Sequence, residues 1–206
     1  MKVFKFGGAS VKDASGVINI LSVLKHTGFS ETLIVVSAMG KTTNALEEVV
    51  KNYFDGTARY IEDLEKIKQN HYQIIAELFQ QDSAQTKENI DKLFEEIIVF
   101  LNNNNSKDYS LIYDQVVSLG ELVSTTIISN YITSQGIENR WLDARKCIKT
   151  DNYYRDANLD WEATQKSILK AAFGNSTLIS QGFIGSDSEG LTTTLGREGS
   201  DYSAAI

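Results

Sequence analysis

The sequence contains no proline and only one cysteine among its 206 residues. The lack of proline is unusual but excludes no class of function. A single thiol cannot form a disulfide within the chain, which excludes the disulfide-stapled folds of small secreted proteins and suits a reducing compartment. Cys147 lies in the segment RKCIK, where we interpret it as a small buried hydrophobe. A chain of this length can bury a stable core without such covalent links.

Positive charge and long apolar runs are also scarce. The chain has 20 Lys and Arg against 27 Asp and Glu, a net charge of -7, which argues against a surface that neutralises nucleic-acid phosphates. No uninterrupted apolar stretch approaches the roughly 20 residues that span a bilayer. The start MKVFKFGGAS lacks a signal-peptide pattern. We therefore expect a cytoplasmic protein with no nucleic-acid or membrane partner, while small charged ligands remain possible.

What is present is an alternation of strand and helix patterns. KVFKF predicts a strand, residues 13–25 a helix, and the apolar run 31–38 a strand buried on both faces. From about residue 43 to 135 the periodicity is almost entirely helical. This rhythm predicts an α/β fold with a helical insertion in the middle.

Shorter signals follow the helical region. Residues 139–144 and the segment CIKT predict strands, 151–158 a polar loop, and 160–173 a helix. The remaining segment predicts a strand, a glycine-bearing hairpin, and a loop that opens a final helix at Ser200 or Asp201. No repeat or low-complexity linker divides the chain.

The first strand ends in a turn that could bind an anion. Gly7 and Gly8 follow Lys5 by two and three residues. Glycines let backbone N–H groups approach an anion, and a nearby lysine supplies a point charge. An ordinary strand-to-helix turn with a surface lysine is the alternative.

The second strand ends in SAMGKTTN, which imitates part of a phosphate-binding loop. Val35 stands where the G-x-x-x-x-G-K motif needs its first glycine, so that motif is absent. No G-x-G-x-x-G turn is present either, which disfavours a Rossmann dinucleotide site. Ser37 and Thr43 remain as polar groups at the carboxyl end of a strand, suited to a small polar ligand. Capping of the next helix by Thr42 or Thr43 is equally compatible with the pattern.

Two further segments could contact a ligand. Gly120 interrupts a strong helical pattern and predicts a bend or a close approach, with Glu121 available for a ligand ammonium or simply solvated. In GREGSD, Arg197 could bind a carboxylate or phosphate in bidentate fashion. Ser200 and Asp201 could instead cap a helix. A nucleic-acid-clamping G-x-x-G loop is disfavoured by the acidic composition.

The order and wording of these segments resemble one family. KFGGAS, VVSAMGKTTN, SLGELVST, WLDAR and SQGFIGSDSEGLTTTLGREGSDYSAAI together resemble an aspartokinase of the amino-acid kinase superfamily. The resemblance covers the whole chain. It implies a three-layer αβα sandwich around a mostly parallel sheet, truncated, with residues 1–206 forming the aspartate-binding part of the catalytic domain. The nucleotide-binding remainder and the regulatory ACT domains of the family have no counterpart here.

The resemblance also implies residue roles. The phosphate-facing set would be Lys5, Gly7 and Gly8, with Asp201 organising the catalytic Lys5. The aspartate pocket would be formed by Ser37, Thr43, Glu121, Arg197 and Ser200. Glu121 would receive the substrate ammonium and Arg197 a substrate carboxylate. No residue is expected to be a dedicated metal ligand.

Two positions depart from the family pattern. Ala9 stands where many members have Thr, and Glu198 stands where many have Gly or Asn. Because Glu198 adds a negative charge beside Arg197, we predict that its side chain points away from the pocket.

The implied activity is ATP- and Mg²⁺-dependent phosphorylation of the side-chain carboxylate of L-aspartate, the first step of lysine, threonine and methionine biosynthesis. The implied assembly of the full-length protein is a homodimer, and we predict that residues 1–206 alone are inactive. A glutamate or acetylglutamate kinase of the same superfamily, or a non-catalytic amino-acid-binding domain, are the alternatives.

Overall fold

A parallel four-stranded sheet forms the centre of the computed structural model, which describes residues 1–80, 83–171 and 177–206. Its strands lie in the order β1-β2-β4-β3, and a separate antiparallel hairpin consists of β5 and β6. The strands are β1 (Lys2–Phe6), β2 (Thr32–Val36), β3 (Asn139–Leu142), β4 (Thr177–Gln181), β5 (Ile184–Ser186) and β6 (Thr192–Thr194).

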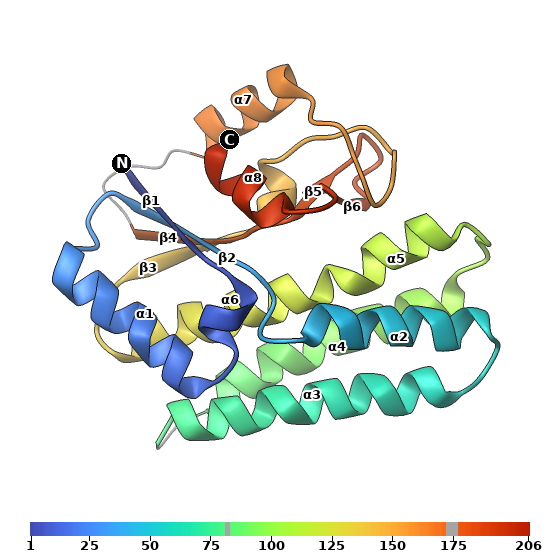
Figure 1. Cartoon of the computed structure of the whole chain (residues 1–206), viewed down its shortest axis with the longest axis horizontal. Coiled ribbons are helices and arrows are strands. Elements are labelled where there is room, and N and C mark those ends of the chain that lie inside the picture. The colour runs from blue at the N-terminus through green and yellow to red at the C-terminus, as the bar shows by residue number, and fades with distance from the viewer. Residues whose placement is uncertain (81–82, 172–176) are drawn as a thin grey trace.

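Helices cover both faces of the sheet, so the expected α/β fold is confirmed (Figure 1). On one side lie α1 and α6, with α2 to α5 extending this layer into a helical bundle, while α7 and α8 lie on the other side (Figure 1). The helices are α1 (Ala14–Thr27), α2 (Thr42–Phe54), α3 (Arg59–Leu78), α4 (Ala84–Asn103), α5 (Tyr109–Val117), α6 (Leu119–Ser134), α7 (Trp161–Lys170) and α8 (Gly199–Ala205). Two 3-10 turns, Gly8–Val11 and Ala144–Lys146, follow β1 and β3.

The sequence patterns explain most of these boundaries. All five residues of β4 are buried, as are four of the five in β2, because both strands lie inside the sheet. The Asp13 carboxylate accepts a hydrogen bond of 2.9 Å from Gly16 N, which fixes the start of α1. Asp160 caps α7 in the same way through Ala163 N.

The pair α5 and α6 forms a nearly continuous helix through the core. Ser118 separates them, and its hydroxyl donates to the Gln115 carbonyl oxygen at 2.9 Å. By length and composition the stretch Tyr109–Ser134 could cross a membrane, but its most apolar window is 89% buried inside the fold. It is therefore the central core helix of the molecule.

One strand expectation is wrong. The segment CIKT makes only isolated bridges, from Lys149 to Ser186 and from Thr150 to Leu159. Its backbone N–H groups bond to two different elements: Thr150 N donates to the Ser186 carbonyl of β5, and Lys149 N donates to the Thr164 hydroxyl of α7. The helix expected over 160–173 ends at Lys170, and its last two expected residues lie outside the described ranges.

Candidate active site

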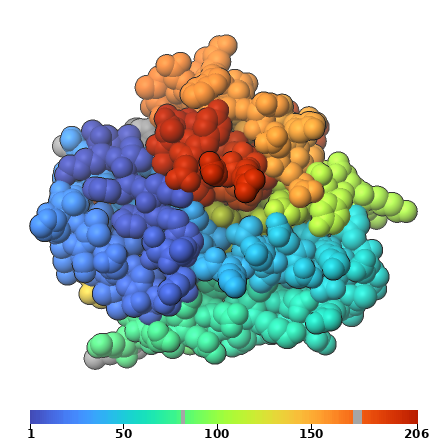
Figure 2. All heavy atoms as spheres, in the orientation of Figure 1, coloured from blue at the N-terminus to red at the C-terminus, as the bar shows by residue number. Residues whose placement is uncertain are grey.

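The parallel strands all end at one edge of the sheet, and a pocket of about 580 Å³ lies there. The turns after β1 and β2, the N-terminal half of α6 and the loop before α8 form its walls. Figure 2 shows the residues of α8 next to the N-terminal segment, with α2 below them. Ligands of open α/β sheets bind in this position. Eight of the nine residues that the sequence singles out line the pocket: Lys5, Gly8, Ser37, Thr43, Glu121, Arg197, Ser200 and Asp201.

Lys5 and Asp201 form an ion pair across the two ends of the chain. The distance from Lys5 Nζ to Asp201 Oδ2 is 3.0 Å. Lys5 belongs to β1 and its side chain is 25% exposed, whereas Asp201 lies in the first turn of α8 and is 65% exposed. The carboxylate therefore restrains the ammonium at the pocket while leaving it accessible to a ligand.

The glycine turn after β1 packs directly against the turn after β2. A Cβ on Gly8 would lie 2.6 Å from the Ala38 carbonyl oxygen, so only glycine fits there. Gly40 N donates to the Gly8 carbonyl oxygen at 3.0 Å. Gly7 does not line the pocket, but a Cβ there would lie 3.5 Å from Lys5 Nζ. Gly8 thus allows the two turns to pack closely, while the predicted approach of these glycines to an anion stays a prediction.

Ser37 and Thr43 bracket the turn after β2. Ser37 is half-buried, and its carbonyl oxygen accepts a hydrogen bond of 2.8 Å from the Ser124 hydroxyl of α6. Thr43 lies in the first turn of α2. Neither side chain caps α2, because no side-chain capping bond is present at that helix start. Thr42 bonds instead to the Met39 carbonyl.

Glu121 is a buried carboxyl group with one unsatisfied oxygen. The residue is 3% exposed; Oε1 accepts a hydrogen bond of 3.2 Å from Ala38 N, and Oε2 has no partner. Burial raises the pKa of Glu121 from its usual value near 4.5 to about 8. A carboxyl in this state is suited to a cationic ligand group, which would restore the ionised form.

Gly120 places Glu121 in this position. A Cβ on Gly120 would lie 2.8 Å from the Ala38 Cβ, so the helix backbone approaches the β2 turn more closely than alanine permits. This confirms the close approach predicted from the glycine inside a helical pattern.

The loop before α8 carries Arg197, Glu198 and Ser200. Arg197 and Glu198 are exposed, and Ser200 is half-buried against Gly182, whose added Cβ would lie 2.8 Å from the Ser200 Cα. Glu198 has a left-handed backbone with φ of 61° and contributes to the pocket wall. Among the ion pairs of the described residues there is none between Arg197 and Glu198.

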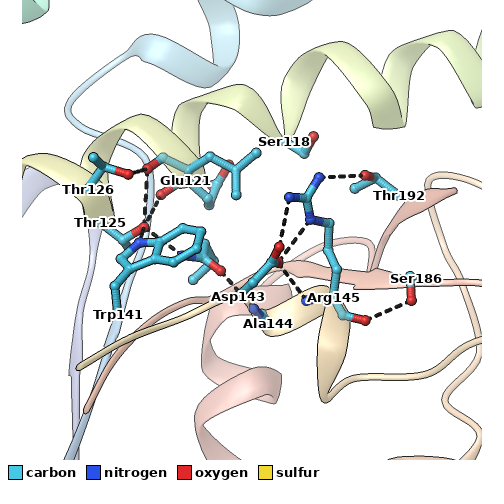
Figure 3. A network of polar contacts seen from close by, with 12 residues as sticks. Ser118, Glu121, Thr125, Thr126, Trp141, Asp143, Ala144, Arg145, Ser186 and Thr192 are labelled. Atoms are coloured by element: carbon cyan, nitrogen blue, oxygen red, sulfur yellow. Dashed lines mark hydrogen bonds and ion pairs between the residues drawn. The ribbon is translucent and has the colours of Figure 1, made fainter. Parts of the chain in front are cut away.

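The WLDAR segment supports the site without lining it. Asp143 holds the Arg145 guanidinium through both carboxylate oxygens at 2.9 and 2.8 Å, and Trp141 Nε1 donates to the Thr125 hydroxyl at 3.0 Å (Figure 3). The Thr125 hydroxyl donates to the Glu121 carbonyl oxygen at 2.8 Å. These bonds tie the end of β3 to the helix that carries Glu121.

Sequence reasoning missed three lining residues: Tyr113, Arg155 and Phe183. Tyr113 and Arg155 lie in segments that carry no motif. Phe183 follows the glycine of the SQGFIG segment, and its φ of 71° is a conformation that the sequence does not reveal.

Comparisons with known proteins agree with this geometry. The lysine-sensitive aspartokinase 3 of Escherichia coli (strain K12) is 31% identical over an alignment of 207 positions, which covers 99% of this chain and 45% of that protein. The aspartokinase of Chlamydia trachomatis serovar D is 30% identical over 99% of this chain and 44% of its own length. The chain therefore spans less than half the length of these relatives.

Solved structures show the same similarity. Aspartokinase III of E. coli in complex with lysine and aspartate matches with a TM-score of 0.88 and 31% identity, over 100% of this chain and 46% of that one. Its complex with aspartate and ADP matches with a TM-score of 0.87 and 30% identity, over 100% of this chain and 45% of that one. The model of the amino acid kinase family matches residues 1–206. The chain thus belongs to the amino acid kinase family.

Proposed function

We propose that this chain forms the aspartate-binding part of an aspartate kinase. The observation that carries the proposal is the unpartnered Oε2 of Glu121, buried at a pocket that also holds Arg197 and the Lys5–Asp201 pair. An amino-acid dicarboxylate offers one ammonium for Glu121 and a carboxylate for Arg197. The similar E. coli enzyme was solved with aspartate and ADP bound, which supports the same ligand class here.

The chemistry needs no general base in the protein. The side-chain carboxylate of aspartate has a pKa near 3.9 and is already an ionised nucleophile at neutral pH. ATP supplies the γ-phosphoryl group, and its transfer to that carboxylate gives 4-phospho-aspartate and ADP. Catalysis then depends on positioning and on neutralising negative charge, the role we assign to Lys5 and the backbone N–H groups of the Gly7–Gly8 turn. Asp201 orients Lys5 through their 3.0 Å contact.

The described residues offer little for a protein-bound metal. Among them no group of three or more His, Cys, Asp or Glu side chains is placed to hold an ion. We therefore propose that Mg²⁺ accompanies the phosphates of the nucleotide, with Asp201 as the adjacent carboxylate.

Other ligands of the same superfamily are the alternative. A glutamate kinase would need room for one more methylene, and an acetylglutamate kinase would present a neutral amide instead of an ammonium. The unsatisfied carboxyl oxygen of Glu121 favours an unblocked amino group. A thermal-shift comparison of L-aspartate, L-glutamate and N-acetyl-L-glutamate separates these ligands, and no shift with any of them would favour a domain that has lost binding.

The catalytic assignment is tested with Lys5→Met in the full-length protein. We expect aspartate-dependent ADP formation to fall by at least about 1,000-fold, because a charge that stabilises the transition state is lost, while aspartate affinity changes by less than about tenfold. Lys2→Met is the matched control, since Lys2 lies on the same strand but bonds to the Thr27 carbonyl away from the pocket. Near-normal turnover by Lys5→Met would contradict the assignment.

We also propose that the full-length protein is cytoplasmic and homodimeric, and that it acts at the start of lysine, threonine and methionine biosynthesis. That residues 1–206 alone do not form ADP is a further prediction, checked by the same coupled assay on this chain.

A further inference from the structure

Backbone strain is concentrated at the pocket. In the described part of the chain, four residues other than glycine have positive φ: Glu31, Arg155, Phe183 and Glu198. Three of these four line the pocket, and Glu31 does not. Such conformations cost free energy and persist where the surroundings impose them, often at functional sites. Arg155, with φ of 73°, lies in a segment to which the family resemblance assigns no role.

A buried carboxylate holds the backbone of Arg155 in this conformation. Asp114 of α5 is fully buried, and its two oxygens accept hydrogen bonds from Arg155 N at 3.2 and 3.0 Å. The same carboxylate accepts bonds from the N–H and the hydroxyl of Thr194 at 2.8 and 2.7 Å. The position of Arg155 is thus fixed from the core, relative to β6 and the loop that follows it.

The Arg155 guanidinium packs over two tyrosine rings, and one of these tyrosines, Tyr113, lines the pocket. Its guanidinium carbon lies 4.5 Å from the Tyr113 ring centroid and 5.7 Å from that of Tyr109. Tyr113 is itself fixed, because its hydroxyl donates to Glu47 Oε1 at 2.7 Å. Arg155 forms no salt bridge among the described residues. Its donors remain available at a pocket wall.

The charges that line the pocket favour a further positive group such as the Arg155 guanidinium. Lys5 is paired with Asp201, and Glu198 adds a negative charge beside Arg197. A dicarboxylate ligand brings two negative charges, and among the lining residues Glu198 and Asp201 are also acidic. A second guanidinium, on the loop that packs against Gly196 next to Arg197, offsets this negative charge.

We propose that Arg155 is a second cationic ligand-binding residue of this pocket, receiving a carboxylate of the acidic substrate alongside Arg197. The proposal rests on the proposed function, because it assigns Arg155 to the same ligand class. Its role is to raise affinity and selectivity for a dianionic amino acid, with the strained backbone and the Tyr113 stack holding the guanidinium in place before the ligand arrives.

The test compares Arg155→Gln, Arg155→Lys and Arg155→Gly by isothermal titration of the 206-residue chain with L-aspartate. Gln and Lys keep the strained backbone and differ in charge, whereas Gly relieves the strain and so protects the fold. We expect Kd to rise about tenfold for Gln and Gly, the loss of one charge-assisted hydrogen bond, and less than about threefold for Lys. The loss for Gln should shrink between 50 and 500 mM salt, because screening weakens a charge contact and not a packing defect.

Arg59→Gln is the charge-matched control, since Arg59 lies on α3 beside Asp63 and outside the pocket; its Kd should equal that of the unchanged chain. Equal Kd values for the unchanged chain and Arg155→Gln would overturn the inference, as would a salt-independent loss that Lys does not rescue. Failure of the unchanged chain to bind L-aspartate would instead contradict the proposed function itself.

Discussion

Glu121 shows how one buried side chain can couple ligand binding to a proton. Burial raises the pKa of its carboxyl to about 8, so this carboxyl is mostly protonated at pH 7 before a ligand binds. A ligand ammonium interacts more favourably with the ionised carboxylate than with the neutral carboxyl. Binding therefore favours release of the Glu121 proton below about pH 8, and this release becomes easier as the pH rises.

We predict that aspartate affinity increases with pH up to about 8, by at most about tenfold per pH unit, and that binding at pH 7 releases close to one proton. Calorimetry in two buffers of different ionisation enthalpy measures the released proton, and Kd at pH 6, 7 and 8 gives the slope. Glu121→Gln has no proton to lose, so its binding should be weaker and flat over this range. If the chain without substitutions binds aspartate and releases no proton, Glu121 does not receive the ammonium.

At the scale of elements, the contact between α6 and the β2 turn positions Glu121. In an exposed helix, Gly→Ala would stabilise by up to about 1 kcal/mol. At Gly120 the new Cβ would lie 2.8 Å from the Ala38 Cβ, and overpacking of this kind costs about 1–3 kcal/mol. Since the backbone N–H of Ala38 binds Glu121, displacing the turn also disturbs the site.

We predict that Gly120→Ala lowers the melting temperature by about 2–8 °C, a net loss of about 1–2 kcal/mol, and weakens aspartate binding. Ser22→Ala on the exposed face of α1 is the control for helix propensity, since it removes only an exposed hydroxyl that bonds to the Ile18 carbonyl of the same helix at 3.3 Å; its melting temperature should be unchanged or slightly higher. Thermal unfolding followed by circular dichroism makes the comparison. A higher melting temperature for Gly120→Ala would contradict this prediction, because it would mean that the turn after β2 can move to accommodate the added Cβ at little cost in stability.

The sequence predicts elements well where the periodicity is local. The alternating KVFKF and the capped helix after Asp13 appear in the structure as β1 and α1. The break at Ser118 is not visible in the sequence, because the helical periodicity continues through it from α5 into α6. CIKT fails as a strand because its backbone partners come from two distant elements.

The site residues likewise fall into those that a local motif reveals and those that only a long-range contact places. Lys5, Glu121 and Arg197 lie in recognisable motifs and line one pocket, so resemblance finds them. Arg155 lies in a motif-free loop, and the bond that fixes it joins residues 41 positions apart. A contact of that separation is created by the fold and leaves no local pattern.

At the scale of the whole molecule, α5 joins the helical bundle to the C-terminal hairpin. The Gln115 side chain accepts from Thr192 N at 3.0 Å and donates to the Thr192 carbonyl at 2.7 Å. Asp114 accepts from Thr194 N at 2.8 Å. Two helix side chains thus satisfy the backbone of β6 along its free edge, where an unpaired strand would otherwise expose donors and acceptors. The loop bearing Arg197 follows this strand, so its placement depends on α5.

The cost of this arrangement is a buried carboxyl, whose pKa is raised to about 6 by desolvation. The folded state binds the proton more tightly than the unfolded state, whose Asp114 has a pKa near 3.8. The Asp114 contribution to the unfolding free energy therefore falls as the pH rises from about 4 to 6, by up to about 3 kcal/mol.

The variant Asp114→Asn lacks this titration, and its amide N–H group would face the Arg155 N–H. We predict that the variant is less stable at every pH and that its deficit narrows between pH 4 and 7. Urea unfolding of both proteins across that range measures the deficit; Asp55→Asn, at an exposed carboxylate, controls for net charge. A deficit that stays constant or widens with pH would show that Asp114 is already ionised at pH 4.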